Sequence, residues 1–460
     1  MNRLKNSPGI ILTVSAVASF ITAFMSSSIN VALPAIANDF SANAVLLSWI
    51  ATTYILSGVA SLIPIGKLSD IYGRAKYLRI GILVFAVSCL ASGFSNSSVM
   101  LLVLRAVQGI GLSFIFINSF SIIVSVYPAN KRGHVLGIAI SSVYIGLSIG
   151  PFLGGIITQQ FGWRYIFYFS FAISLILYLV MVFFITEDWK VSEGEKFDYK
   201  GSAVFTFAIT SLMLGFSFVP NVSGFVLIAA GLGMFYYYKV VSEKIEFPVL
   251  RLDIFKNNKT FTFSNIAALI NYSATSAISF LLSLYLQHIK AMTPQEAGTV
   301  LVAQPIFMAV FSPIAGRLSD RIEPQHVSSL GMLLISICLG LLCFVGNETT
   351  VFFIVVNLGV LGVGFALFSS PNSNAIMSSV DKSNYGTAST LLSLMRMTGQ
   401  MMSMAIVIVI FTVIIGKAEI KPENHEQLIS SVRIAFALFS FLCFIGIFAS
   451  LSRGKMHKTI

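Results

Sequence analysis

The feature that most constrains this chain is a series of long apolar runs, each long enough to cross a lipid bilayer. A membrane-spanning helix needs about 20 predominantly apolar residues. Fourteen runs of that kind follow one another, at 9–36, 45–66, 77–96, 98–126, 134–161, 165–186, 200–220, 223–241, 261–286, 295–315, 327–346, 350–373, 386–415 and 430–451. Apolar residues make up 56% of the chain and charged residues only 10%. No water-soluble fold can hide that much apolar surface, so the sequence predicts an all-α polytopic membrane protein and excludes a soluble enzyme, a disordered chain and a nucleic-acid binder.

The basic residues between the runs predict the orientation, because cytoplasmic loops of membrane proteins carry an excess of Lys and Arg. Arg105 and Arg396 lie inside runs. If the N-terminus is cytoplasmic, the opposite side holds only five of the 29 basic residues, namely Arg164, Lys290, Lys417, Lys421 and Arg433. We therefore expect a multi-pass protein of the cell (plasma) membrane with an even number of spans and both termini in the cytoplasm.

An internal repeat divides the chain. Gly66-Lys67-Leu68-Ser69-Asp70 recurs as Gly316-Arg317-Leu318-Ser319-Asp320, at the predicted cytoplasmic ends of the second and tenth runs. Repeats at matching places in the topology indicate two related halves. Because eight spans separate the copies, we predict an N-terminal six-helix bundle (1–186), a linker with two extra transmembrane helices at 200–220 and 223–241 (187–260), and a C-terminal six-helix bundle (261–460).

The first copy of the repeat continues to Lys76 and predicts a conformational latch. Gly66 and Gly73 permit a tight turn and a close approach of helices. Asp70 can cap a helix or pair with Arg74, and such a pair can hold two bundles in one state and release them in the other. The alternative is a plain topogenic loop. The second copy, with Gly316 and Asp320, is followed by Arg-Ile-Glu-Pro and lacks the later Gly-Arg, so the first copy is the better latch candidate.

Two further motifs lie inside runs. Arg105, in Leu101-xxx-Arg105-Ala-Val-Gln108-Gly109-Ile-Gly111, is a charge within the fourth run. It is expected to face a cavity or a polar partner, or alternatively to extend to the interface. In the fifth run, the sequence Gly146-xxx-Gly150-Pro151-xx-Gly154-Gly155 aligns small residues on one helix face, which lets another helix approach closely, while Pro151 can kink the helix.

These motifs together make the chain resemble a major facilitator superfamily transporter, and within it the fourteen-span drug:proton antiporter branch of bacterial multidrug and tetracycline exporters. The quoted motifs are joined by Asn30-Val-Ala-Leu-Pro34 and by Gly162-Trp163-Arg164-Tyr165-Ile-Phe167. The resemblance implies two six-helix bundles around a central cavity that opens alternately to either side. It further implies that the loop 66–76 gates the cytoplasmic side, that the Gly-Pro run serves antiport, and that Arg105 serves proton coupling.

The acidic residues depart from that branch, in which an Asp commonly stands where this chain has Met25. None of the 18 acidic residues lies in the middle of a run. Proton-driven pumps usually use a buried acid whose pKa changes between the two access states. Coupling then runs through acids at the ends of spans, or the protein moves a neutral or anionic substrate with weak or different ion coupling. The acids in question are Asp39, Asp70, Asp320 and Glu296.

The sequence predicts an exporter of amphipathic small molecules (drugs or antibiotics) that exchanges them for protons. The alternative is an exporter of a specific neutral or anionic metabolite. No motif of an enzyme, a channel filter, a metal site or a cofactor site is present, and a monomer is expected. The substrate cavity candidates are polar, aromatic or sulfur-containing residues within runs: Met25, Asn30, Tyr54, Asn118, Tyr144, Asn271, Tyr272, Gln304, Asn357, Arg396 and Gln400.

Overall fold

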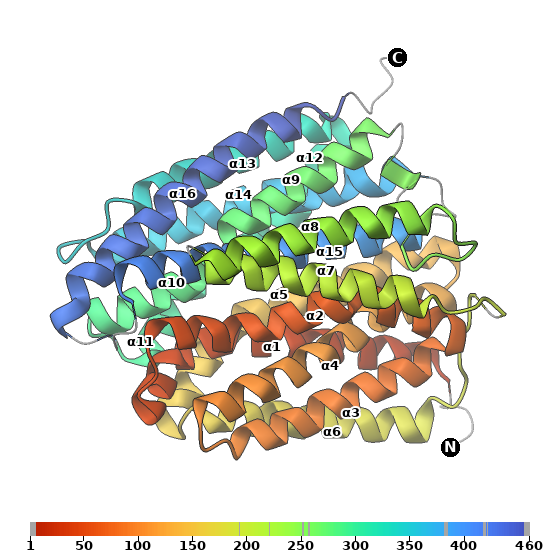
Figure 1. Ribbon diagram of the computed structural model, residues 1–460, viewed down its shortest axis with the longest axis horizontal. Coiled ribbons are helices and arrows are strands. Elements are labelled where there is room, and N and C mark those ends of the chain that lie inside the picture. Colours follow the sequence, from red (N-terminus) through yellow and green to blue (C-terminus); the bar gives the residue numbers. More distant parts are fainter. Residues whose placement is uncertain are drawn as a thin grey trace. The chain divides into compact units, whose positions relative to one another are not determined.

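The computed structural model describes residues 6–192, 194–219, 221–250, 253–255, 258–380, 385–416, 420 and 422–454. For residues 129–134, 136, 140, 217, 253, 320, 385 and 386 only the backbone is described. Throughout these ranges the chain forms helices joined by short turns, and no strand occurs among them (Figure 1). The prediction of an all-α membrane fold is therefore confirmed.

The helices of the first part of the chain follow the predicted runs closely. The chain divides into two compact units, of which the first comprises Met1–Ala42 and Trp49–Leu250. Several helices extend a few residues past the apolar runs, as expected where helix ends protrude from the bilayer. The helices are α1 (Pro8–Phe40), α2 (Ala44–Tyr72), α3 (Arg74–Gly93), α4 (Ser98–Val126), α5 (Ala129–Gln160), α6 (Arg164–Phe184), α7 (Tyr199–Phe218) and α8 (Val222–Ser242).

The second unit comprises Asn43–Ser48 and Arg251–Ile460. It begins with a short 3₁₀ turn, η2 (Asp253–Phe255), and contains a second one, η5 (Pro422–Asn424). Its other elements are α9 (Lys259–Thr275), α10 (Ile278–Leu284), the π-helix η3 (Tyr285–Ile289), α11 (Pro294–Leu301), α12 (Ala303–Arg321), α13 (Pro324–Leu342), α14 (Val351–Ser378), α15 (Tyr385–Ile414) and α16 (His425–Leu451).

The order of helix packing is the same in both units. In the first unit α1 packs against α5, α4 and α6, and α3 packs against α4 and α6. In the second unit α9 packs against α15, α14 and α16, and α13 packs against α14 and α16. Five helices of each unit thus pack in the same order, as two related halves would. Helices α7 and α8 pack mainly against each other, and the Thr206 hydroxyl of α7 donates a hydrogen bond to the Ala60 carbonyl of α2 at 2.9 Å.

Two runs that the sequence predicted as single helices are interrupted. The run 261–286 breaks between Thr275 and Ile278, where the Ala277 amide donates to the Ser403 hydroxyl at 3.0 Å. Thr275 and Ser276 compete there for helix carbonyls with their own hydroxyls. The run 295–315 breaks at Val302, three residues before Pro305, which has no amide hydrogen to continue the helix.

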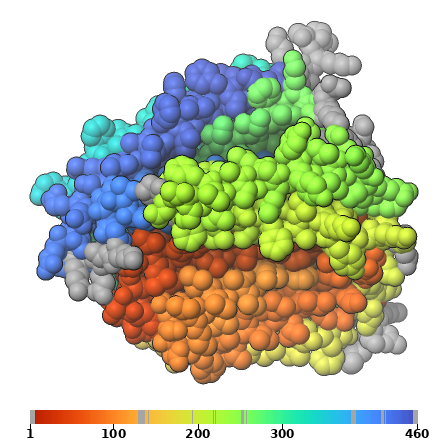
Figure 2. All heavy atoms as spheres, viewed as in Figure 1, coloured from red at the N-terminus to blue at the C-terminus, as the bar shows by residue number. Residues whose placement is uncertain are grey.

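Thirteen stretches of the described chain are helices long and apolar enough to cross a membrane. The predicted span at 200–220 forms α7, which is not among the thirteen. Helix α8 is exposed on the face of the molecule drawn in Figure 2, where it is yellow-green. Its most exposed side chains are Val222, Phe225, Val226, Leu232, Tyr236 and Tyr237. Aromatic and aliphatic residues exposed along a spanning helix are typical of a surface that faces lipid.

Candidate functional site

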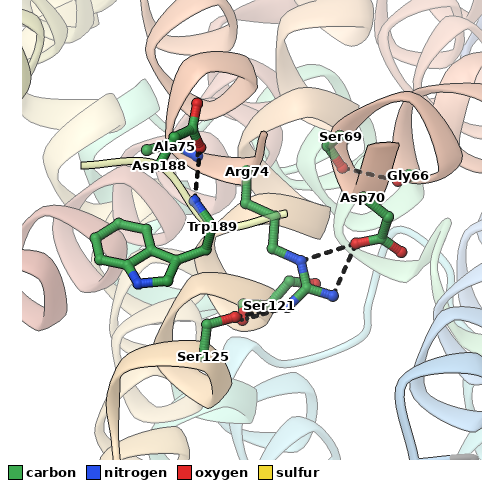
Figure 3. A network of polar contacts seen from close by, with 9 residues as sticks. All are labelled: Gly66, Ser69, Asp70, Arg74, Ala75, Ser121, Ser125, Asp188 and Trp189. Atoms are coloured by element: carbon green, nitrogen blue, oxygen red, sulfur yellow. Dashed lines mark hydrogen bonds and ion pairs between the residues drawn. The ribbon is translucent and has the colours of Figure 1, made fainter. Parts of the chain in front are cut away.

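The loop that joins α2 to α3 contains a compact polar cluster (Figure 3). The Arg74 guanidinium donates to the Asp70 carboxylate, with Nε 2.8 Å and Nη2 2.7 Å from Oδ1. Its Nη1 also donates to the Ser121 carbonyl at 3.0 Å and to the Ser125 hydroxyl at 2.7 Å, both on α4. The side chains of Asp70 and Arg74 are 33% and 13% exposed. The predicted pairing is therefore confirmed, and the pair ties the α2–α3 turn to α4.

The two glycines of this loop do different things. Gly73 has φ of +119°, a conformation that side-chain-bearing residues rarely adopt. Gly66 is ordinary helical backbone, but a Cβ there would lie 2.9 Å from Cδ1 of Ile117 on α4. Gly73 therefore allows the turn itself, and Gly66 allows the close approach of α2 to α4.

The segment after α6 lies against this turn, which sequence reasoning did not foresee. The Arg74 amide donates to the Trp189 carbonyl at 3.0 Å, and the amides of Val191 and Ser192 both donate to the Asp70 carbonyl at 3.0 Å. Lys67 forms an ion pair with Glu195. The one sequence signal is the acidic pair Glu187-Asp188, which directly follows the sixth run and is equally typical of an ordinary polar linker.

The second copy of the repeat keeps the local turn. Ser319 donates to the Gly316 carbonyl at 2.7 Å, just as Ser69 donates to the Gly66 carbonyl at 2.8 Å. The side chain of Asp320 lies outside the described part of the chain. Helix α12 ends at Arg321, and Ile322 continues in an extended conformation. No left-handed glycine follows, as the missing Gly-Arg predicted.

Arg105 is enclosed within the first unit, at 0% exposed surface. Its Nε donates to the Ile50 carbonyl at 3.2 Å and its Nη1 to Gln108 Oε1 at 2.8 Å. The Tyr54 ring lies 4.2 Å from its Cζ. Its Nη2 has no hydrogen-bond partner in the described chain. The alternative that this arginine extends to the membrane interface is therefore wrong, because the side chain points into the helix bundle.

The glycine stripe of α5 packs directly on α1. A Cβ on Gly146 would lie 2.5 Å from the Phe20 carbonyl oxygen, and one on Gly154 would lie 2.7 Å from Ser28 Cβ. A Cβ on Gly150 would overlap the Ser27 hydroxyl, which donates to the Gly146 carbonyl at 3.3 Å. The stripe thus permits close packing of two helices within one unit. Pro151, inside α5, and Gly155 are buried beside it.

The acids at the ends of spans have structural partners. Asp39 Oδ2 accepts from Arg164 Nη1 at 2.5 Å and from Trp163 Nε1 at 3.0 Å. Glu296 forms a capping box with Thr293 at the start of α11. No carboxylate lies in the middle of a described helix. The role of these acids in coupling stays a prediction.

The cavity candidates of the first unit lie at different depths. Tyr54 is buried against Arg105, and its hydroxyl donates to the Thr22 carbonyl at 3.0 Å. Met25 and Asn118 are fully buried, whereas Asn30 and Tyr144 are half-buried. A groove of about 400 Å³ between α1 and α6 contains none of these residues.

The candidates of the second unit include one aromatic cluster. The Tyr272 ring contacts the Phe365 ring, with centroids 5.6 Å apart, and the Arg396 guanidinium, whose Cζ lies 5.0 Å from the Tyr272 centroid. Asn271 is fully buried, and neither polar atom of its side chain has a partner in the described chain. Asn357 donates to the Cys338 carbonyl at 3.1 Å. Gln304 and Gln400 are half-buried.

Comparisons with known proteins agree with this architecture. Residues 15–250 and 265–458 match the family model described as Major Facilitator Superfamily. The chain is 30% identical to the riboflavin transporter RibZ of Clostridioides difficile over 84% of each chain. It is 26% identical to the multidrug resistance protein Stp of Mycobacterium tuberculosis, over 82% of this chain and 71% of that one.

A third relative is the tetracenomycin C resistance and export protein of Streptomyces glaucescens. It is 26% identical over 78% of this chain and 69% of its own length. The family match covers most of the helices described above, and its members are membrane transporters rather than enzymes. This chain belongs to the Major Facilitator Superfamily.

Proposed function

We propose that the protein exports amphipathic small molecules, in exchange for protons, by exposing a binding site alternately to the two sides of the membrane. The observation that carries the proposal is the Asp70–Arg74 pair, which fastens the α2–α3 turn to α4 at a half-buried position. A charge pair between two helices can form in one arrangement of the helices and break in another, so it can act as a two-state element. The names of the multidrug resistance and export relatives support drugs as substrates.

The charges inside the units favour neutral or anionic substrates. Two arginines, Arg105 and Arg396, lie within membrane spans, and the described spans carry no carboxylate at mid-depth. A cation bound beside either arginine would be repelled by its positive charge in a medium of low dielectric constant. We therefore place lipophilic cations below neutral and anionic compounds in the order of preferred substrates.

A second candidate function is transport of one planar aromatic metabolite. The 30% identity to a riboflavin transporter favours it. So does the Tyr272 ring, which contacts Phe365 and Arg396, because aromatic and guanidinium planes stack on flat conjugated rings. Riboflavin and related flavins are the first compounds to test for this function.

Transport into everted membrane vesicles tests the first function and separates it from the second. We expect uptake of neutral or anionic dyes and antibiotics, and loss of that uptake when a protonophore collapses the pH gradient. An Asp70→Asn protein of equal abundance is the matched control. Gradient-independent uptake would remove proton exchange from the proposal. Uptake of riboflavin with no uptake across a broad drug panel would establish the second function instead.

Orientation and assembly are parts of the same proposal: a monomer in the cell membrane with both termini in the cytoplasm. Cysteines placed at Asn6 and Gly454 test the orientation. The native cysteines interfere little, since Cys89, Cys338 and Cys443 are buried and Cys343 is partly so. An impermeant thiol reagent is expected to label both new sites in everted vesicles and neither in intact cells.

A further inference from the structure

Asp188 caps a helix that begins far away in the sequence. Its Oδ1 accepts from the Ala75 amide at 2.8 Å and from the Trp189 amide at 2.9 Å (Figure 3). Its Oδ2 accepts from the Lys76 amide at 3.2 Å. Ala75 and Lys76 are the second and third residues of α3 (Arg74–Gly93). A carboxylate from the segment after α6 therefore does for α3 what an N-cap side chain usually does for its own helix.

Helix α3 has no cap of its own. Its N-cap residue is Gly73, and its first turn contains no acidic residue. That turn does contain Arg74 and Lys76, which add positive charge to the positive end of the helix dipole. A negative group is favourable at such an end, and Asp188 supplies it.

The geometry of Gly73 explains why the cap comes from elsewhere. A Cβ at Gly73 would overlap the Asp188 carboxylate. Besides the +119° φ angle, this is a second and independent reason for a glycine here: the missing side chain leaves the space that the foreign carboxylate occupies.

The backbone on either side of Asp188 is bonded to the same turn. Trp189 accepts from the Arg74 amide, and Val191 and Ser192 donate to the Asp70 carbonyl. On the other side, Arg79 Nη2 donates to the Ile185 carbonyl at 2.7 Å. Residues 185–192 therefore contact both residues of the Asp70–Arg74 pair and the first turns of α3 that follow it. Within the segment 185–192, Asp188 is the residue that takes part in this set of contacts through its side chain, so a substitution there removes its contacts without altering the backbone.

We propose that Asp188 is a positioning residue for transport: by capping α3 it fixes the α2–α3 turn, and with it the geometry of the Asp70–Arg74 pair. This inference rests on the proposed function of that pair as a latch. It makes the start of the segment 187–199 part of the gating machinery rather than a passive linker. Movement of that segment would be transmitted to the latch through the cap.

The chain offers a matched control in Asp198. Its Oδ1 accepts from the Gly201 amide at 2.7 Å, so it caps α7, the helix that directly follows it. Asp198 belongs to the same linker, and its substitution removes the same charge, but its hydrogen bonds go to Gly201 and Ser202 at the start of α7 and not to the α2–α3 turn. Asp198→Ala should therefore reproduce the general cost of losing a cap without the specific effect on the latch.

Hydrogen exchange of the purified full-length protein tests the cap itself. We expect Asp188→Ala to speed exchange in a peptide covering 74–78 by about fivefold, Asp188→Asn by less, and Asp198→Ala to leave that peptide unchanged. Asp188→Glu should restore part of the protection. Unchanged exchange at 74–78 in Asp188→Ala would overturn the proposal, whatever the transport data show.

Transport in reconstituted vesicles tests the positioning role. We expect Asp188→Ala to lower the maximal rate about threefold or more with little change in KM, Asp188→Glu to recover most of it, and Asp198→Ala to transport normally. Faster exchange with an unchanged maximal rate would overturn the role while leaving the transport function intact. If the wild-type protein transports nothing, the proposed function fails, and the exchange result still decides whether the cap exists.

Discussion

The turns after α2 and after α12 begin with the same five-residue pattern and end differently. In both, a serine hydroxyl closes onto the carbonyl of the leading glycine, at 2.8 Å in the first and 2.7 Å in the second. After Asp70 the chain passes through Gly73 into a helix that starts at Arg74. After Asp320 it ends the helix at Arg321 and restarts at Pro324. The shared five-residue pattern therefore specifies a turn. The residues that follow it, Gly73 and Arg74, are what give the first copy its ion pair.

The chain segments that return to the two turns carry opposite charges. After α6 the acid Asp188 accepts from the start of α3. After α16 the base Arg453 lies near the start of α13, with Nη1 3.4 Å from the Ser328 hydroxyl. Arg453 is 1% exposed, and its Nε and Nη2 have no partner in the described chain. Burial lowers the pKa of this guanidinium below its usual value. One half stabilises its turn with paired charges, whereas in the other no acid among the described side chains pairs with Arg453.

The largest expected effect concerns Arg105 and Arg396, the two arginines within spans. One lies in each half, so substituting each of them compares the cores of the two halves. Arg105→Ala should lower the transport rate about 100-fold or more. It removes a fully buried charge and leaves the Ile50 carbonyl and Gln108 without their hydrogen-bond donor. Arg396→Ala, at a half-buried arginine beside Tyr272, should mainly raise KM for anionic substrates by about tenfold. Vesicle uptake at equal protein abundance measures both. Equal losses of transport rate from the two substitutions would show that the arginines of the two halves have equivalent roles.

The next effect compares the two acids of the repeat. Asp70→Asn should abolish transport while the protein still inserts in the membrane, since it breaks the charge pair with Arg74 but preserves the shape of the side chain. Asp320→Asn should retain most of the activity, because the second copy lacks the Gly-Arg that completes the cluster. Membrane fractionation is the control for insertion. A fully active Asp70→Asn protein would eliminate the latch as a mechanism.

The glycines give a smaller but sharper comparison. Gly73→Ala should destabilise the protein by about 2 kcal/mol and slow transport several-fold, because it forces an unfavourable φ angle and displaces Asp188. Gly316→Ala should cost about 0.5 kcal/mol or less, since its Cβ would meet only the Ser370 hydroxyl at 3.1 Å. Thermal unfolding in detergent provides the measurement. If both variants unfold at the same temperature, the positive φ angle and the overlap at Gly73 are not costly.

Sequence alone was sufficient for the features that depend on composition and local pattern. The apolar runs predicted the helices, and the repeat predicted the paired turns at Gly66 and Gly316. The close approach of another helix to the glycine face of α5 followed from spacing, because residues four apart share a helix face, but the spacing did not identify α1 as that helix. These predictions succeeded since each is fixed by neighbours in the chain.

What sequence could not supply is contact between distant segments. Nothing in the sequence near Gly73 indicates that Asp188 caps α3. A cap from a distant segment of the chain depends on where α6 ends in space. The break at Ala277 likewise depends on the Ser403 hydroxyl of another helix. The burial of Arg453 was missed because a basic residue after the last span reads as an ordinary cytoplasmic charge.

The smallest expected effect tests the buried charge of Arg453. Arg453→Met should leave stability unchanged or raise it by about 1 kcal/mol, because an apolar side chain of similar length avoids the desolvation cost and leaves only one weak contact, to Ser328, unmade. Arg74→Met, the matched change in the other half, should lower stability by about 1 kcal/mol, since it leaves Asp70 and Ser125 without their partner. The two substitutions should therefore shift the unfolding temperature in opposite directions. A marked loss of stability in Arg453→Met would mean that its guanidinium has a compensating partner in the protein. The two turns would then differ in which residue compensates the charge, and not in whether the charge is compensated.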